Sequence, residues 1–138
     1  MRIYIAYKLS KLPDNEKQAL RPKLEAISAE LTRLGNETFI MGRDAQSWTK
    51  EHTSSIRTMS LILKHLNSYD AVLAFIDSDV ASLGMSFEIF YGKLIGKKVI
   101  YLVNSELKNS VRSLIANETI IYNDMSDLSV KLAQRFSR

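Results

Sequence analysis

One carboxylate of this chain stands in an unusual setting. Glu88 lies inside the run SLGMSFEIFYG, residues 82–92, where its immediate neighbours are apolar or aromatic. The run predicts a helix that carries Glu88 in about its first turn. A helix N-terminus favours an ionised carboxylate, whereas an apolar wall favours the neutral acid. An anionic carboxylate in a partly dry pocket suits a covalent nucleophile. The structural alternative is that Glu88 only caps or neutralises the start of the helix.

The loop before this helix carries polar residues that could hold a ligand. Asp77 or Asp79 could bind ribose hydroxyls, and Ser82 could donate a hydrogen bond to a phosphate at the helix N-terminus. The same residue types are common in loops and at N-caps, which is the structural alternative. The chain contains no GxGxxG or GxxxxGK[ST] sequence, so dinucleotide and P-loop sites of the usual kinds are not indicated.

Several other kinds of site are also not indicated. His52 and His65 lack the spacing of a zinc motif, and the absence of cysteine excludes disulfides and thiolate ligands. We therefore expect no metal and no organic cofactor. The net charge of +4 comes from scattered Lys and Arg without a basic block, which predicts affinity for small anions and no nucleic-acid surface. Trp48 could stack on a base, although a single loop Trp can equally cover the core.

The composition and the N-terminus predict a cytoplasmic protein without a membrane partner. The sequence is 46% hydrophobic and 25% charged, which is ordinary for a soluble globular chain. No stretch approaches the roughly 18–20 apolar residues that a membrane span needs. The chain opens on a strand-like run, RIYIAY, rather than on the basic and apolar regions of a signal peptide.

Strand-like and helical segments alternate along the chain. A leucine-rich pattern from Leu20 to Leu34 predicts the first helix, which starts or kinks at Pro22 and stops at Gly35-Asn36. This alternation predicts one domain, residues 1–138, with a doubly wound, flavodoxin-like, parallel five-stranded sheet and helices on both faces. The expected strands are 2–7, 38–41, 71–76, 98–103 and 119–122; the expected helices are 20–34, 56–66, about 85–96, 106–114 and from about Met125; 42–51 and 77–84 are loops.

Ligands of such sheets bind outside the carboxyl ends of the strands, near the point where the winding direction reverses. This rule directs attention to three loops, which begin after the first, second and third strands. The candidate substrate-binding residues in these loops are Tyr7, Lys8, Ser10, Met41, Trp48, Asp77 and Ser82.

The stretch from Asp70 to Val103 resembles the nucleoside 2-deoxyribosyltransferases and their relatives, the 2'-deoxynucleoside 5'-monophosphate N-glycosidases. The resemblance rests on an Asp that opens a strand, an acidic loop, the helix start GMSFEI and the sequence GKKVI, together with the first strand. It implies that Glu88 is the nucleophile and that Tyr4 hydrogen-bonds it. It also implies that the Ser82-Leu83-Gly84 sequence binds a 5'-phosphate, with Met85 beside the substrate.

The chain departs from this family at two places. Ile62 stands where the family usually carries an aspartate, so Asp77 or Asp79 would have to act as the general acid, or the activity is altered or lost. The loop after the first strand has Tyr7-Lys8 in place of the usual glycine, and Lys8 or Ser10 could still face a phosphate.

Four functions are therefore open, and the first is the one we expect. The chain cleaves the base–sugar bond of a nucleoside 5'-monophosphate or (deoxy)nucleoside through Glu88. Alternatively, it exchanges bases as a deoxyribosyltransferase. A second resemblance, to TIR domains, suggests an NAD glycohydrolase, although their usual Trp-Cys before the glutamate is absent. The fourth is a non-enzymatic nucleotide-binding module, which Ile62 favours. The family resemblance also implies a homodimer or larger homo-oligomer.

Overall fold

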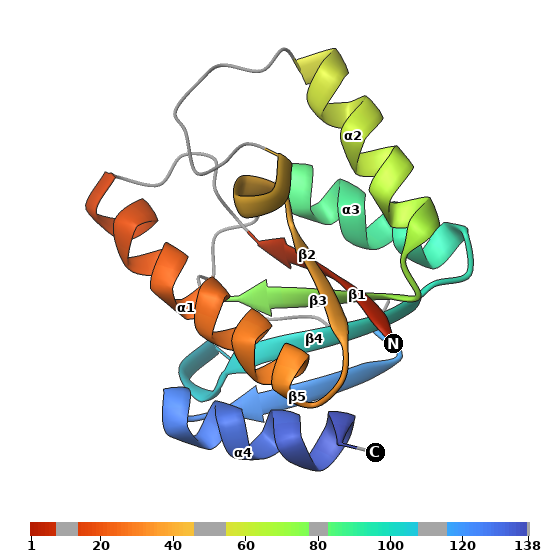
Figure 1. Ribbon diagram of the computed structural model, residues 1–138. Coiled ribbons are helices and arrows are strands. Elements are labelled where there is room, and N and C mark those ends of the chain that lie inside the picture. Colours follow the sequence, from red (N-terminus) through yellow and green to blue (C-terminus); the bar gives the residue numbers. More distant parts are fainter. Residues whose placement is uncertain (8–13, 46–54, 78–82, 108–115, 138) are drawn as a thin grey trace.

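Five strands form one parallel sheet in the order β2-β1-β3-β4-β5, which is the flavodoxin-like order (Figure 1). The computed structural model describes residues 1–7, 14–45, 55–77, 83–107 and 116–137. The predicted fold class is confirmed. The strands are β1 Arg2–Tyr7, β2 Glu37–Ile40, β3 Ala71–Ile76, β4 Lys98–Asn104 and β5 Glu118–Tyr122; the α-helices are α1 Asp14–Arg33, α2 Ser55–Ser68, α3 Leu83–Leu94 and α4 Met125–Phe136.

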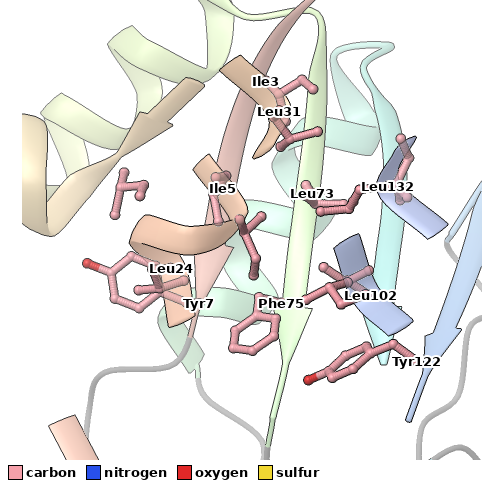
Figure 2. Close-up of a cluster of buried hydrophobic side chains, with 14 of the residues drawn as sticks. Ile3, Ile5, Tyr7, Leu24, Leu31, Leu73, Phe75, Leu102, Tyr122 and Leu132 are labelled. Atoms are coloured by element: carbon pink, nitrogen blue, oxygen red, sulfur yellow. The ribbon is translucent and has the colours of Figure 1, made fainter. Parts of the chain in front are cut away.

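Each face of the sheet is covered by two helices, as Figure 1 shows. Successive side chains of a strand point to opposite faces, so β1 sends Ile3, Ile5 and Tyr7 into a core shared with α1 and α4 (Figure 2). The same strand sends Tyr4 and Ala6 into a second core, which is shared with α2 and α3. The winding direction reverses between β1 and β3, so the switch point lies at the carboxyl ends of these two strands.

The first helix differs from its prediction. α1 runs from Asp14 to Arg33 and continues through Pro22, so it does not begin there. Pro22 is exposed, where water can hydrogen-bond the carbonyl that has lost its amide partner. The predicted stop is confirmed, because Gly35 has a φ of 92°, a left-handed conformation that glycine adopts easily.

The second helix, predicted over residues 56–66, is confirmed as Ser55–Ser68. Ile62 and Leu66 are buried, whereas Met59 is 41% exposed. Met59 lies one turn before Ile62, so the apolar face of α2 extends beyond the part of the helix that packs against the sheet. Among the helices that the structure describes, none is long and apolar enough to cross a membrane.

The structure differs in detail from the prediction in the segments 42–51 and 106–114. The first part of the predicted loop 42–51 is a π-helical turn, η1 Met41–Ala45. Asp44 accepts a hydrogen bond from the Ile40 amide at 2.8 Å, and Arg43 donates to Ser28 Oγ at 2.6 Å, which ties η1 to α1. The predicted helix 106–114 begins in a 3-10 turn, η2 Ser105–Leu107, and its remainder lies outside the described residues.

Candidate active site

Glu88 lies on the sheet-facing side of α3, and only 8% of it is exposed. Gly92, four residues later, lies on the same face of the helix. A Cβ atom at Gly92 would lie 2.8 Å from Cγ2 of Val72 on β3, so only glycine lets α3 approach the sheet this closely. Because of this close approach, the turn that contains Glu88 lies against β1 and β3. Local packing therefore buries a carboxylate at the switch point of the sheet.

Tyr4 faces Glu88 from β1. Its side chain is fully buried, with its ring centroid 5.3 Å from that of Phe39. Among the described residues its hydroxyl has no partner at normal hydrogen-bond geometry. The two groups are nevertheless close enough to act on each other electrostatically. Burial and then the charge of Glu88 raise the pKa of Tyr4 well above its usual range, which keeps the hydroxyl protonated.

Burial dominates the acidity of Glu88. It raises the pKa of the Glu88 carboxyl from 4.5 to about 8, and the Tyr4 hydroxyl offsets only part of this increase. No Lys, Arg or His of the described segments contributes to holding the charged form. Most of the Glu88 carboxyl is therefore protonated at pH 7. A carboxyl group with a pKa near neutrality in a buried position is typical of an active site.

Tyr7 ends β1 and joins it to η1. Its hydroxyl accepts a hydrogen bond from the Gly42 amide at 2.9 Å. The pKa of Tyr7 is raised to about 12, chiefly by burial and less by the charges of Glu88 and Asp44, while the hydrogen bond from Gly42 acts to lower it. The ring packs in the core with α1 and α4, and the hydroxyl contacts Gly42, which follows the carboxyl end of β2.

Two methionines bring an apolar lining to the Glu88 side of the sheet. Met41 of η1 and Met85 of α3 are 8% and 9% exposed, and both belong to the buried cluster of Tyr4 and Ile62. Ile62, at the position where the resemblance expects a carboxylate, is thus a core residue. The structure therefore brings Glu88, Tyr4, Met41 and Met85 together on one face.

Asp77 lies on the other side of the sheet. Its Oδ2 atom is 2.9 Å from Nζ of Lys23 on α1. Its charge also contributes, after burial, to the raised pKa of Tyr122, which belongs to the core shared with α1 and α4. Asp77 therefore has structural partners away from Glu88, and its binding of substrate stays a prediction.

The other predicted site residues are described only in part. Gly84 lies in the first turn of α3. The remaining candidates, Lys8, Ser10, Trp48, Asp79 and Ser82, lie outside the described residues. Within the described part of the chain, no three His, Cys, Asp or Glu side chains are grouped as metal ligands would be.

Sequence reasoning missed the contribution of Gly92, for which the signal was a glycine four residues after Glu88 on the same predicted helix face.

The comparisons with known proteins establish the fold. No family model matches the sequence, and no curated protein matches it significantly. The structure is similar to that of a CMP N-glycosidase from Clostridium botulinum, with 20% identity, coverage of 98% of this chain and 99% of that chain, and a TM-score of 0.71. It is also similar to a 2-deoxyribosyltransferase from Bacillus psychrosaccharolyticus (18% identity, 94% and 90% coverage, TM-score 0.58). A conserved protein from Enterococcus faecalis V583 shares 16% identity, with 97% and 98% coverage and a TM-score of 0.60. At such identities the likeness shows that the chain shares the fold of these proteins over nearly its whole length.

Proposed function

We propose that this chain is an N-glycosidase that cleaves the base–sugar bond of a nucleoside 5'-monophosphate or (deoxy)nucleoside, with Glu88 as its nucleophile. The observation that carries the proposal is the buried Glu88 carboxyl facing Tyr4 at the switch point of the sheet. The structural likeness to an enzyme described as a CMP N-glycosidase and to a 2-deoxyribosyltransferase supports the same reaction class.

In the proposed reaction an oxygen of the Glu88 carboxylate attacks C1' of the sugar. The bond between C1' and the base nitrogen breaks, and its electron pair leaves with the base. The transition state has oxocarbenium character, and the product is an ester between Glu88 and the sugar, as in retaining glycoside hydrolysis. Water then attacks C1' of the ester, which restores the carboxylate and frees the sugar.

The neighbouring residues would position and shield Glu88. The Tyr4 hydroxyl remains protonated because its pKa is raised, so it can donate a hydrogen bond to the carboxylate once Glu88 ionises. Met41 and Met85 would form an apolar wall beside the substrate. The sequence further suggests that Ser82, Gly84, Lys8 and Ser10 contact the phosphate. In the same proposal Trp48 packs against the base, and Asp79 acts as the general acid. The proposed reaction requires no metal or organic cofactor.

Three other outcomes would assign a different function. If the ester is resolved by a second base, the chain is a deoxyribosyltransferase. If nicotinamide is released from NAD, while nucleosides and monophosphates are not cleaved, the chain is an NAD glycohydrolase. If no base is released from any donor, the chain is a binding module. We place the protein in the cytoplasm as a homodimer or larger homo-oligomer, also as a proposal.

A panel of donors tests these assignments in one experiment. The protein is incubated with purine and pyrimidine nucleosides, their 5'-monophosphates and NAD, with and without an added second base. Free and exchanged bases are quantified by liquid chromatography. Release of base from a nucleoside or monophosphate without a second base supports the N-glycosidase. Exchange that depends on the second base, or release from NAD alone, would refute it in favour of the corresponding alternative.

A further inference from the structure

The turn η1 is held in place by the side chains of two of its own residues. Asp44 accepts a hydrogen bond from the Ile40 amide at 2.8 Å and pairs with Arg43 at 2.9 Å. Arg43 donates to Ser28 Oγ on α1 at 2.6 Å and to the Thr38 carbonyl of β2 at 3.3 Å. A π-helical turn is a rare element that occurs frequently at functional sites. These contacts therefore fix a rare element against β2 and α1.

Tyr7 adds the contact that joins η1 to the neighbouring strand β1. Its hydroxyl oxygen accepts a hydrogen bond from the Gly42 amide at 2.9 Å, and its ring packs in the core shared with α1 and α4 (Figure 2). Tyr7 ends β1, and the same strand carries Tyr4, which faces Glu88. The hydrogen bond to Gly42 therefore sets the position of η1 relative to the strand that also carries Tyr4.

Met41, the first residue of η1, has its side chain on the other side of the sheet. This side chain is 8% exposed and belongs to the buried cluster of Tyr4 and Met85. The peptide unit that joins Met41 to Gly42 thus has its N–H bonded to Tyr7, while the side chain before it lies in that cluster. A methionine side chain is unbranched and flexible, so its position depends on where its backbone is held. A change at the Tyr7 hydroxyl is therefore transmitted to Met41 through one peptide unit.

From these contacts we infer that Tyr7 is a positioning residue for the base of the substrate. Through the hydrogen bond to Gly42 it holds Met41 where the thioether packs against the planar ring of a heteroaromatic base, a type of contact that methionine makes favourably. In this assignment Tyr7 acts through Met41 and does not itself contact the substrate. The inference rests on the proposed function, because it assigns the binding of the base at the same site.

The inference predicts an effect on substrate binding rather than on bond cleavage. The ring face that Met41 contacts is present both before and during the reaction. An interaction that is equally strong in the ground state and in the transition state raises the affinity without raising kcat. Loss of the Tyr7 hydroxyl should therefore raise KM at nearly constant kcat, whereas partial unfolding would lower the apparent kcat.

Nuclear magnetic resonance tests the positioning step independently of activity. Tyr7→Phe removes the hydroxyl and keeps the ring. In this variant we expect the Gly42 amide to exchange with deuterium about tenfold faster, and the methyl resonance of Met41 to shift. The matched control is Tyr69→Phe, which alters a buried tyrosine at the amino end of β3 and should change neither signal. An unchanged Gly42 exchange rate or an unchanged Met41 resonance in Tyr7→Phe would overturn the inference whether or not base is released.

A double-mutant cycle tests whether Tyr7 acts through Met41. With the best donor of the panel, we expect Tyr7→Phe and Met41→Ala each to raise KM about fivefold, with kcat within about twofold of the wild type. Met41→Val takes the place of the alanine variant if that variant does not fold. The double variant should be no worse than the Met41 variant alone, because the side chain that Tyr7 positions is already missing. Tyr69→Phe should leave KM unchanged.

The outcomes separate the inference from the proposed function. A lower kcat at unchanged KM in Tyr7→Phe, or a double variant that shows the product of the two single effects, would overturn the inference while the N-glycosidase proposal stands. No base release from any donor, together with the expected resonance changes, would refute the proposed function and with it the contact between Met41 and the base.

Discussion

Replacing Glu88 with glutamine should make the fold more stable at alkaline pH. Between pH 4.5 and about 8 the folded protein retains a proton on Glu88 that the unfolded chain has already released. Raising the pH therefore draws the equilibrium toward the unfolded chain. A change of the pKa from 4.5 to about 8 corresponds to about 5 kcal/mol of lost unfolding free energy in the wild type. Glutamine has nearly the same shape and cannot ionise, so Glu88→Gln avoids this loss.

Urea denaturation of both proteins from pH 4 to pH 9 measures the effect. At pH 4, where the carboxyl is protonated in both states, the midpoints should nearly coincide. By pH 8 the midpoint of Glu88→Gln should lie about 2 M above that of the wild type, since a small domain changes by roughly 1–3 kcal/mol per molar urea. Glu25→Gln, at an exposed ion pair, should show no such divergence. A difference that stays flat with pH, or a wild type that gains stability between pH 5 and 8, would refute the unpaired burial of Glu88.

Three further substitutions probe the site and its support. Tyr4→Phe removes a buried hydroxyl that has no described partner, so turnover should fall while the unfolding free energy stays equal or rises by about 1 kcal/mol; a large loss of stability with normal turnover would make Tyr4 a core residue only. Gly92→Ala places a methyl group against Val72. It should lower the unfolding free energy by about 1–3 kcal/mol and reduce turnover by shifting α3. Unchanged stability and turnover would show that the contact between α3 and β3 can accommodate a methyl group. Ser82→Ala should remove most of the preference for 5'-monophosphates over nucleosides, a loss of about tenfold or more in kcat/KM for one charge-assisted hydrogen bond worth roughly 1.5–3 kcal/mol; an unchanged preference would remove the phosphate role of Ser82.

The sheet could be predicted well from the sequence because its strands are covered on both faces. The continuous apolar run AVLAFI predicts the third strand with the bounds that the structure gives, Ala71–Ile76. Of the two alternatives predicted for Pro22, a helix start there is wrong, because α1 already begins at Asp14 and continues through the proline. Pro22 lies on the exposed side of the helix, where the missing hydrogen bond costs little. The turn η1 could not be predicted because its hydrogen bonds link it to residues distant in sequence, Ser28 and Tyr7.

Part of the candidate site could also be predicted from the sequence. Apolar neighbours around Glu88 indicated a desolvated carboxylate, and its burial and raised pKa confirm that environment. The position of Asp77 could not be predicted from the sequence, because its ion pair with Lys23 joins residues 54 positions apart. The depth of Glu88 depends on Gly92 and Val72, a contact between a helix and a strand that no local pattern encodes.

The most direct test of the account is the release of base by Glu88→Ala. Wild type and variant are incubated with the best donor of the panel, and free base is quantified while circular dichroism checks the fold. Because the substitution removes the attacking oxygen, we predict that base release is abolished in a protein that remains folded. If Glu88 only capped the helix, its loss would cost about 0.5–2 kcal/mol of stability and leave turnover intact. Near-normal base release by a folded Glu88→Ala protein would therefore contradict the account.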